Sequence, residues 1–90
     1  MKIVINSCYG GFGLSEEAYK YIGIDWDSYG FAFVDDRTHP LLIEAVEELG
    51  EKASGRFAKL KIVDIPENVD WEIYDYDGME TIRERARQWM

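Results

Sequence analysis

The segment that most constrains the fold is the N-terminal run from an apolar strand through a glycine-rich loop into a helix start. Residues 2–6 are rich in β-branched side chains, a pattern typical of a buried strand. Residues 7–13 contain three glycines, and Ser15 then offers a helix cap. This helix is expected to end near Ile22, because Gly23 supplies a stop signal. The sequence therefore predicts a strand–loop–helix unit.

An amphipathic pattern predicts a second helix over about residues 40–49. Thr38 is the expected cap, and Gly50 ends the pattern. Before this helix, residues 29–34 are either a strand or an aromatic loop that covers the core. The helix has one apolar stripe, formed by Leu41, Leu42, Ala45, Val46 and Leu49.

The second half of the chain predicts two strands and a last helix. Residues 57–65 and 70–76 are the strands, close enough in sequence to form an antiparallel hairpin. Asp77 to Glu80 resembles a capping box, which predicts a helix over residues 79–89. The expected core residues are Ile3, Ile5, Leu41, Ala45, Val46, Leu49, Leu60, Ile62, Ile73, Ile82 and Ala86.

These elements predict an α+β (or mixed α/β) fold in the order β-α-(β)-α-β-β-α. We expect one domain over residues 1–90, with a small mixed sheet of about three to four strands and about three helices. A thin core carrying many aromatic residues favours a homodimer as the way to bury leftover apolar surface.

Charge and cysteine content narrow the function classes. The 10 Lys and Arg face 18 Asp and Glu, a net charge of −8, which argues against direct nucleic-acid binding. No apolar run approaches the roughly 18 residues of a membrane helix. The lone Cys8 excludes an internal disulfide and fits the cytoplasm.

The glycine loop is the main candidate site. A strand, a glycine loop and a helix start form a common geometry for holding an anion, although Gly11 and Gly13 only begin a dinucleotide motif, whose last position is Glu16. The alternative is a tight connection whose aromatic residues pack on the core. The residues predicted to line a pocket are Asn6, Tyr9, Gly10, Gly11, Phe12, Gly13 and Ser15, with Arg37, His39 or Arg87 supplying positive charge.

Other chemistry has weaker support. Cys8 and His39 would need to meet in space to form a nucleophile and base, and no spacing supports that pairing. Residues 75–84 resemble a calcium loop, but Ile73 falls at the first ligand position and cannot coordinate. We therefore expect no metal and no cofactor, and the residues favour a binding protein over an enzyme.

Four stretches together resemble a family of short proteins encoded by bacteriophages and prophages. They are residues 1–15 (MKIVINSCYGGFGLS), 37–44 (RTHPLLIE), 58–66 (AKLKIVDIP) and 76–80 (YDGME). Small phage accessory proteins often inhibit host defence, and some bind nucleotide-derived immune signals such as cyclic ADP-ribose isomers without cleaving them. The resemblance thus implies a protein of the host bacterial cytoplasm with an anti-defence role.

Two functional hypotheses follow. The first is a non-enzymatic protein that binds a small anionic, nucleotide-like ligand and sequesters a host immune signal. The second is an acidic inhibitor that binds and blocks a host defence protein, motivated by the net charge and by the acidic residues between 64 and 80.

Overall fold

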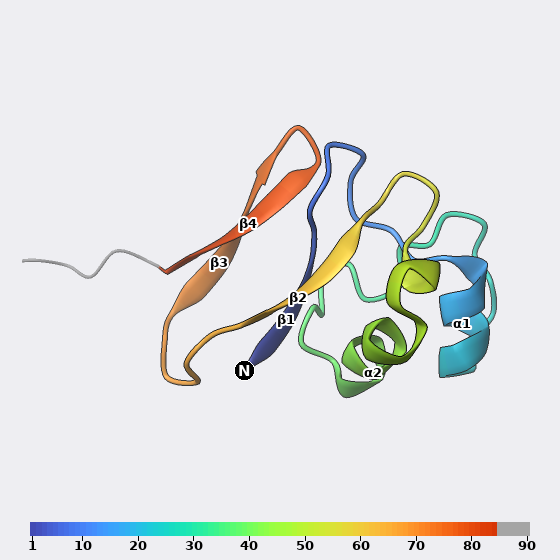
Figure 1. The fold of residues 1–90 in the computed structure, drawn as a ribbon, viewed down its shortest axis with the longest axis horizontal. Helices are drawn as coiled ribbons and strands as arrows, with labels where there is room; N and C mark the ends of the chain where they lie inside the picture. The colour runs from blue at the N-terminus through green and yellow to red at the C-terminus, as the bar shows by residue number, and fades with distance from the viewer. Residues whose placement is uncertain (85–90) are drawn as a thin grey trace, which may run out of the picture.

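The computed structural model describes residues 1–84 and shows a mixed α+β fold (Figure 1). The predicted fold class is correct, but the described residues contain two α-helices rather than three. In chain order the elements are β1 (Lys2–Asn6), α1 (Glu16–Ile22), α2 (Pro40–Leu49), the 3-10 helix η1 (Gly50–Ala53), β2 (Leu60–Asp64), β3 (Trp71–Tyr76) and β4 (Met79–Glu84).

The strands form two separate antiparallel pairs rather than one sheet of three to four strands. β1 pairs with β2, with Val4 opposite Ile62, and β3 pairs with β4, with Ile73 opposite Ile82. The predicted hairpin between residues 57–65 and 70–76 is therefore wrong. β2 instead returns alongside the N-terminal strand, since that pairing places Val4 and Ile62 toward the helices.

The predicted last helix is also wrong over the described residues, because residues 79–84 form β4. Asp77 and Gly78 have φ angles of 55° and 90°. Two successive positive φ values are typical of a two-residue hairpin turn whose twist matches the flanking strands. Asp77 and Gly78 thus form a hairpin turn rather than a helix start. The rest of that predicted helix, Ala86 included, lies outside the described residues.

The two α-helices begin and end close to the predicted positions. The Ser15 hydroxyl accepts a hydrogen bond from the Ala18 N–H at 3.1 Å, and Gly23 closes α1 in the left-handed conformation. The cap of α2 is His39 rather than Thr38: its Nδ1 accepts from the Leu41 N–H at 3.1 Å. A ring nitrogen of the imidazole thus takes the place expected of a hydroxyl.

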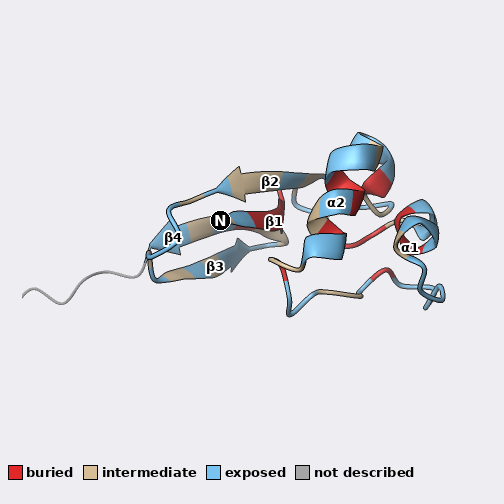
Figure 2. Cartoon of the chain, turned by 90° about the horizontal axis from the view of Figure 1, so that it is seen from below, coloured by how far each residue is buried: buried red, intermediate tan, exposed pale blue. Residues whose placement is uncertain are grey.

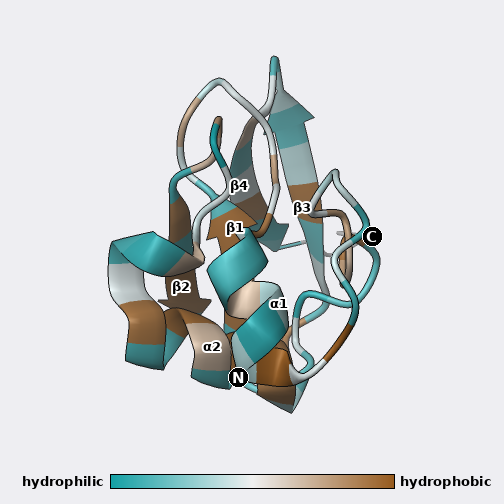
Figure 3. Cartoon of the chain, turned by 90° about the vertical axis from the view of Figure 1, so that its right-hand side faces the viewer, coloured by the Kyte–Doolittle hydropathy of each residue, from teal (hydrophilic) through white to brown (hydrophobic). Residues whose placement is uncertain are grey.

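The main core lies between α1, α2 and one face of the β1–β2 pair (Figures 2 and 3). Leu60 and Ile62 are partly buried against this core. Leu41 is 43% exposed, so its predicted place in the core is wrong. The buried residues of this cluster are Val4, Phe12, Leu14, Ala18, Tyr19, Leu42, Val46 and Ala53.

A second apolar layer lies on the other face of β1. Ile3 and Ile5 are fully buried, as predicted, and Ile5 lines a small cavity together with Ile82 of β4. Ile73 and Ile82 are only half-buried. The β3–β4 hairpin therefore covers the side of β1 that the helices leave open (Figure 1). Neither α-helix of the described chain has the length and apolar character needed to cross a membrane.

Candidate functional site

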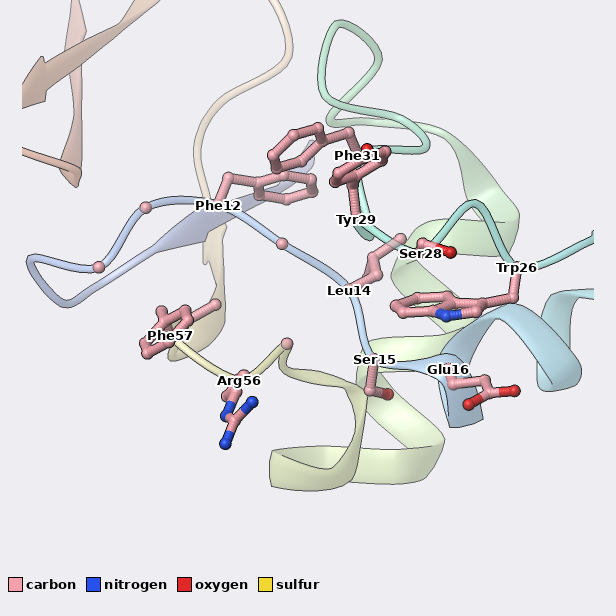
Figure 4. Close-up of a pocket in the computed structure, with 15 residues that line it drawn as sticks. Phe12, Leu14, Ser15, Glu16, Trp26, Ser28, Tyr29, Phe31, Arg56 and Phe57 are labelled. Carbon is pink, nitrogen blue, oxygen red and sulfur yellow. The ribbon is translucent and has the colours of Figure 1, made fainter.

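A cleft of about 590 Å³ opens where the glycine loop meets two segments distant in sequence (Figure 4). Its walls come from residues 10–16, from the aromatic segment 26–31 and from the turn 55–58. The lining residues with side chains are Phe12, Leu14, Ser15, Glu16, Trp26, Ser28, Tyr29, Phe31, Arg56, Phe57 and Ala58, and four glycines complete the surface.

Backbone contacts fix these three walls against one another. The Leu14 N–H donates to the Gly30 carbonyl, and the Gly55 N–H donates to the Gly13 carbonyl, each at 2.8 Å. A Cβ added at Gly10 would lie 1.7 Å from the Phe57 carbonyl oxygen, so only glycine permits this approach. The cleft is therefore held by main-chain packing.

Asp27 organises the aromatic wall. Its carboxylate accepts the N–H groups of Tyr29 and Gly30, at 2.8 and 2.6 Å, and the Tyr19 hydroxyl at 2.8 Å. Hydrogen bonds to the ionised form, that from Gly30 foremost, lower the pKa of Asp27 to about 2. One carboxylate thus ties the aromatic segment to a buried tyrosine of α1.

Three of the rings around the cleft, those of Tyr29, Phe31 and Phe57, are largely exposed. Tyr29 and Phe31 stack on each other with centroids 6.0 Å apart and are 72% and 55% exposed. Trp26 contacts Tyr19 edge-on, with centroids 4.9 Å apart, and Phe57 is 71% exposed. Exposed aromatic rings gathered at a cleft offer stacking surfaces for a flat ligand.

Opposite charges stand at the two sides of the cleft. Figure 4 shows Arg56 and Phe57 on one side of the Leu14–Ser15 backbone, and Glu16 and Trp26 on the other. Further along the same loop, the N–H groups of Phe12 and Gly13 donate no hydrogen bond to another described residue. The site therefore combines a guanidinium, unused backbone donors and a separate carboxylate.

Five of the predicted site residues line this cleft: Gly10, Gly11, Phe12, Gly13 and Ser15. Tyr9 is exposed outside the lining, and the Ser15 hydroxyl is already engaged, accepting from Ala18 and donating to the Lys52 carbonyl. Phe12 is 8% exposed and lies under the Arg37 guanidinium, 3.8 Å from its ring centroid. The loop backbone, more than its side chains, faces the cleft.

Asn6 is a buried connector away from the cleft lining. Its Nδ2 donates to the carbonyls of Cys8 and Gly78, at 2.6 and 2.7 Å, and its Oδ1 accepts from the Lys59 N–H at 2.7 Å. These bonds use both of its amide hydrogens. Asn6 therefore joins the glycine loop, the approach to β2 and the hairpin turn.

Arg37 forms a buried pair with Glu80. Its Nη1 and Nη2 donate to the two Glu80 oxygens at 2.7 and 2.9 Å, and both residues are at most 8% exposed. Glu80 also accepts the Asn6 N–H at 2.8 Å, while the Arg37 carbonyl accepts the Val4 N–H at 3.0 Å. The pair thus provides acceptors for backbone N–H groups on the edge of β1 that faces away from β2. It also holds the β3–β4 hairpin beside that edge.

The other residues predicted to supply positive charge are His39 and Arg87, and His39 does not line the cleft. His39 caps α2 and lies against Phe33, with ring centroids 4.8 Å apart. Arg87 lies outside the described residues. Cys8 has its own partners, the Asn6 side chain and the Phe57 carbonyl, at 3.4 and 3.3 Å from its sulfur. Within residues 1–84, no group of three or more His, Cys, Asp and Glu side chains is arranged to hold a metal.

Sequence reasoning missed two of the three walls of the cleft. Tyr29 and Phe31 fall in residues 29–34, which the sequence left open as a strand or an aromatic loop; the structure shows no strand there. Trp26 precedes this segment, and Arg56 and Phe57 follow a short turn. The signal that could have found them is the number of large aromatic residues between the two helices. A single buried layer cannot hold that many rings, so some of them must be exposed.

Comparison of the chain with family models, with curated proteins and with solved structures found no match.

Proposed function

We propose that the protein is a non-enzymatic binding protein whose cleft takes a small ligand with a flat ring and an anionic group, a nucleotide or nucleotide-derived molecule. The observation that carries this proposal is the cleft itself, where exposed aromatic rings, Arg56 and a glycine-lined backbone surround one space. Its volume of about 590 Å³ falls within the range of roughly 300–1,000 Å³ that is usual for small-molecule sites.

The charge distribution supports an anionic group at the Arg56 side. On a protein of net charge −8, an anion needs local donors that outweigh long-range repulsion. A guanidinium gives two parallel hydrogen bonds to phosphate oxygens. Phe12 and Gly13 line the same cleft, and their N–H groups are further donors without an acceptor among the described residues. Stacking on rings such as Trp26 or Phe57 would hold the base.

The biological role in this proposal is sequestration of a nucleotide-derived host immune signal. This part rests on the resemblance to small phage-encoded proteins. Binding without turnover agrees with the site, because Cys8 and His39 each have structural partners of their own.

The test is a thermal-shift and calorimetric panel with AMP, GMP, CMP, UMP, cyclic ADP-ribose and inorganic phosphate. We expect at least one nucleotide to raise the melting temperature, since a ligand at 100 times its Kd adds about 2.7 kcal/mol of stability. The ligand should be recovered unchanged by chromatography after incubation.

Two variants locate the binding. Arg56→Met and Trp26→Leu should each weaken binding by about ten-fold or more, because each removes a charge-assisted hydrogen bond or a stacking face. Arg83→Met is the matched control: Arg83 lies over Tyr74 of the hairpin, 3.7 Å from the ring centroid, and does not line the cleft. Absence of binding across the panel, or full binding by Arg56→Met, would overturn the proposal.

A further inference from the structure

The cleft is chemically asymmetric, and this asymmetry orients a ligand. Arg56 stands on one side with Phe57, whereas Glu16 stands on the other side with Trp26 (Figure 4). Glu16 is exposed, and its carboxylate makes no hydrogen bond or ion pair with another described residue. An anionic group is attracted to the Arg56 side and repelled from the Glu16 side, so the ring of the ligand belongs beside Trp26 and Glu16.

A carboxylate beside a stacking ring selects among bases. An ionised carboxylate only accepts hydrogen bonds, and its two oxygens match two adjacent N–H donors. Guanine presents such a pair on its Watson–Crick edge, the N1–H and the N2 amino group. Adenine and cytosine each place a ring-nitrogen acceptor beside their amino group. The lone pair of that nitrogen would face the lone pairs of the carboxylate, and two acceptors repel each other.

We infer that the cleft selects guanine nucleotides, with Glu16 accepting from the Watson–Crick edge, Trp26 stacking on the base and Arg56 holding the phosphate. This inference rests on the proposed function and adds the identity of the base and its orientation. Glu16 acts here as a specificity residue. Glu17, its neighbour in the same helical turn, does not line the cleft and carries the same charge.

The experiment measures Kd by calorimetry for GMP, IMP and AMP on three proteins: the parent, Glu16→Gln and Glu17→Gln. IMP keeps the N1–H of guanine and lacks its amino group. We expect the parent to bind GMP about ten-fold more tightly than AMP, with IMP between them, because a hydrogen bond to a charged group is lost at each step.

The two variants separate base selection from general electrostatics. Glu16→Gln should bring GMP and AMP to within about three-fold of each other, since the amide offers one acceptor and one donor group. Glu17→Gln should keep the parent's preference, although it removes the same charge from the same helical turn. Both positions are exposed, so both variants should fold.

The outcomes distinguish this inference from the proposed function. If no nucleotide binds, both fail. If nucleotides bind and depend on Arg56, but AMP binds the parent as tightly as GMP, the proposed function stands and the guanine inference is wrong. The inference is equally wrong if Glu16→Gln keeps the full preference for GMP.

Discussion

At the scale of single residues, the sequence pointed to polar side chains with a defined role, but it did not predict their hydrogen-bond partners. Asn6 and Arg37 were predicted to contact a ligand, whereas the fold uses their hydrogen-bonding groups internally. Both are buried, and a buried polar group needs partners inside the protein. Burial depends on elements far apart in sequence: Arg37 meets Glu80 from 43 positions away. Local sequence patterns do not predict such a long-range contact.

Asp27 gives the clearest pH dependence. Its pKa is lowered in the folded protein from 3.8 to about 2. A group whose folded pKa is depressed stabilises the fold above its unfolded pKa and loses that contribution as pH falls toward the folded pKa. We therefore expect this contribution to be complete above about pH 4 and lost on approach to about pH 2.

The measurements are the NMR titration of the Tyr29 and Gly30 amides between about pH 5 and pH 1, and unfolding by urea between about pH 5 and pH 2. Both amides should shift with a midpoint near 2 in the parent. In Asp27→Asn that titration should vanish and the aromatic segment should exchange faster with solvent. Asp25→Asn is the control, because Asp25 is exposed directly before this segment and its replacement should leave both amides titrating. Titration midpoints near the ordinary value of 3.8 in the parent would contradict the assignment.

At the scale of elements, local signals located β1, β3 and both helices well, while the pairing of strands stayed hidden. The ends of α1 were predictable because Ser15 and Gly23 act within one helical turn of their partners. The Asp77–Gly78 pair was ambiguous, because the same residues suit a helix start and a two-residue hairpin turn. The buried pair of Glu80 with Arg37 favours the hairpin turn over the helix start. This contact forms only in the assembled fold.

The hairpin turn provides a matched test of close backbone approach. Gly78 has a φ of 90°, and a Cβ there would lie 2.4 Å from the Tyr9 carbonyl oxygen. Gly11 has a φ of 102°, and a Cβ there would meet no atom within 4 Å. Gly11→Ala should cost roughly 1–2 kcal/mol from backbone conformation alone. Gly78→Ala should cost roughly 1–3 kcal/mol more, because backbone must move to relieve the clash.

Urea unfolding of both variants against the parent measures this difference. Circular dichroism at the start of each titration checks that both variants are folded. Equal losses for the two variants would mean that the turn does not press against the glycine loop, and the contact between hairpin and loop would have to be revised.

At the scale of the whole molecule, the sequence predicted one wall of the cleft and the fold supplied the other two. The glycine loop carries its own local pattern, whereas Arg56 and the aromatic segment join it only through long-range contacts such as Gly55 N–H to the Gly13 carbonyl. The net charge of −8 is visible from composition alone. Its consequence for stability depends on how the fold distributes and pairs those charges, and local sequence patterns do not reveal this.

Carboxylates outnumber the cations available to pair with them, 18 against 10. The ion pairs of the described residues include two exposed ones, Met1 with Asp64 and Lys2 with Glu47, while Arg37–Glu80 is buried and weakly screened by salt. The surplus of carboxylates repels itself in the compact state. Screening this repulsion should therefore stabilise the fold more than it weakens the exposed pairs.

We expect the melting temperature to rise by a few degrees when NaCl increases from about 20 mM to about 0.5 M, as the Debye length shortens to a few ångströms. Differential scanning calorimetry without ligand measures the effect. Glu48→Lys is the informative variant, because Glu48 is exposed on α2 and its replacement makes the net charge less negative. This variant should melt higher than the parent at low salt and gain less from added salt, since less repulsion remains to be screened. A melting temperature that falls with salt would show that attractive pairs dominate the surface, and an equal gain in both proteins would show that the effect of salt does not come from net charge.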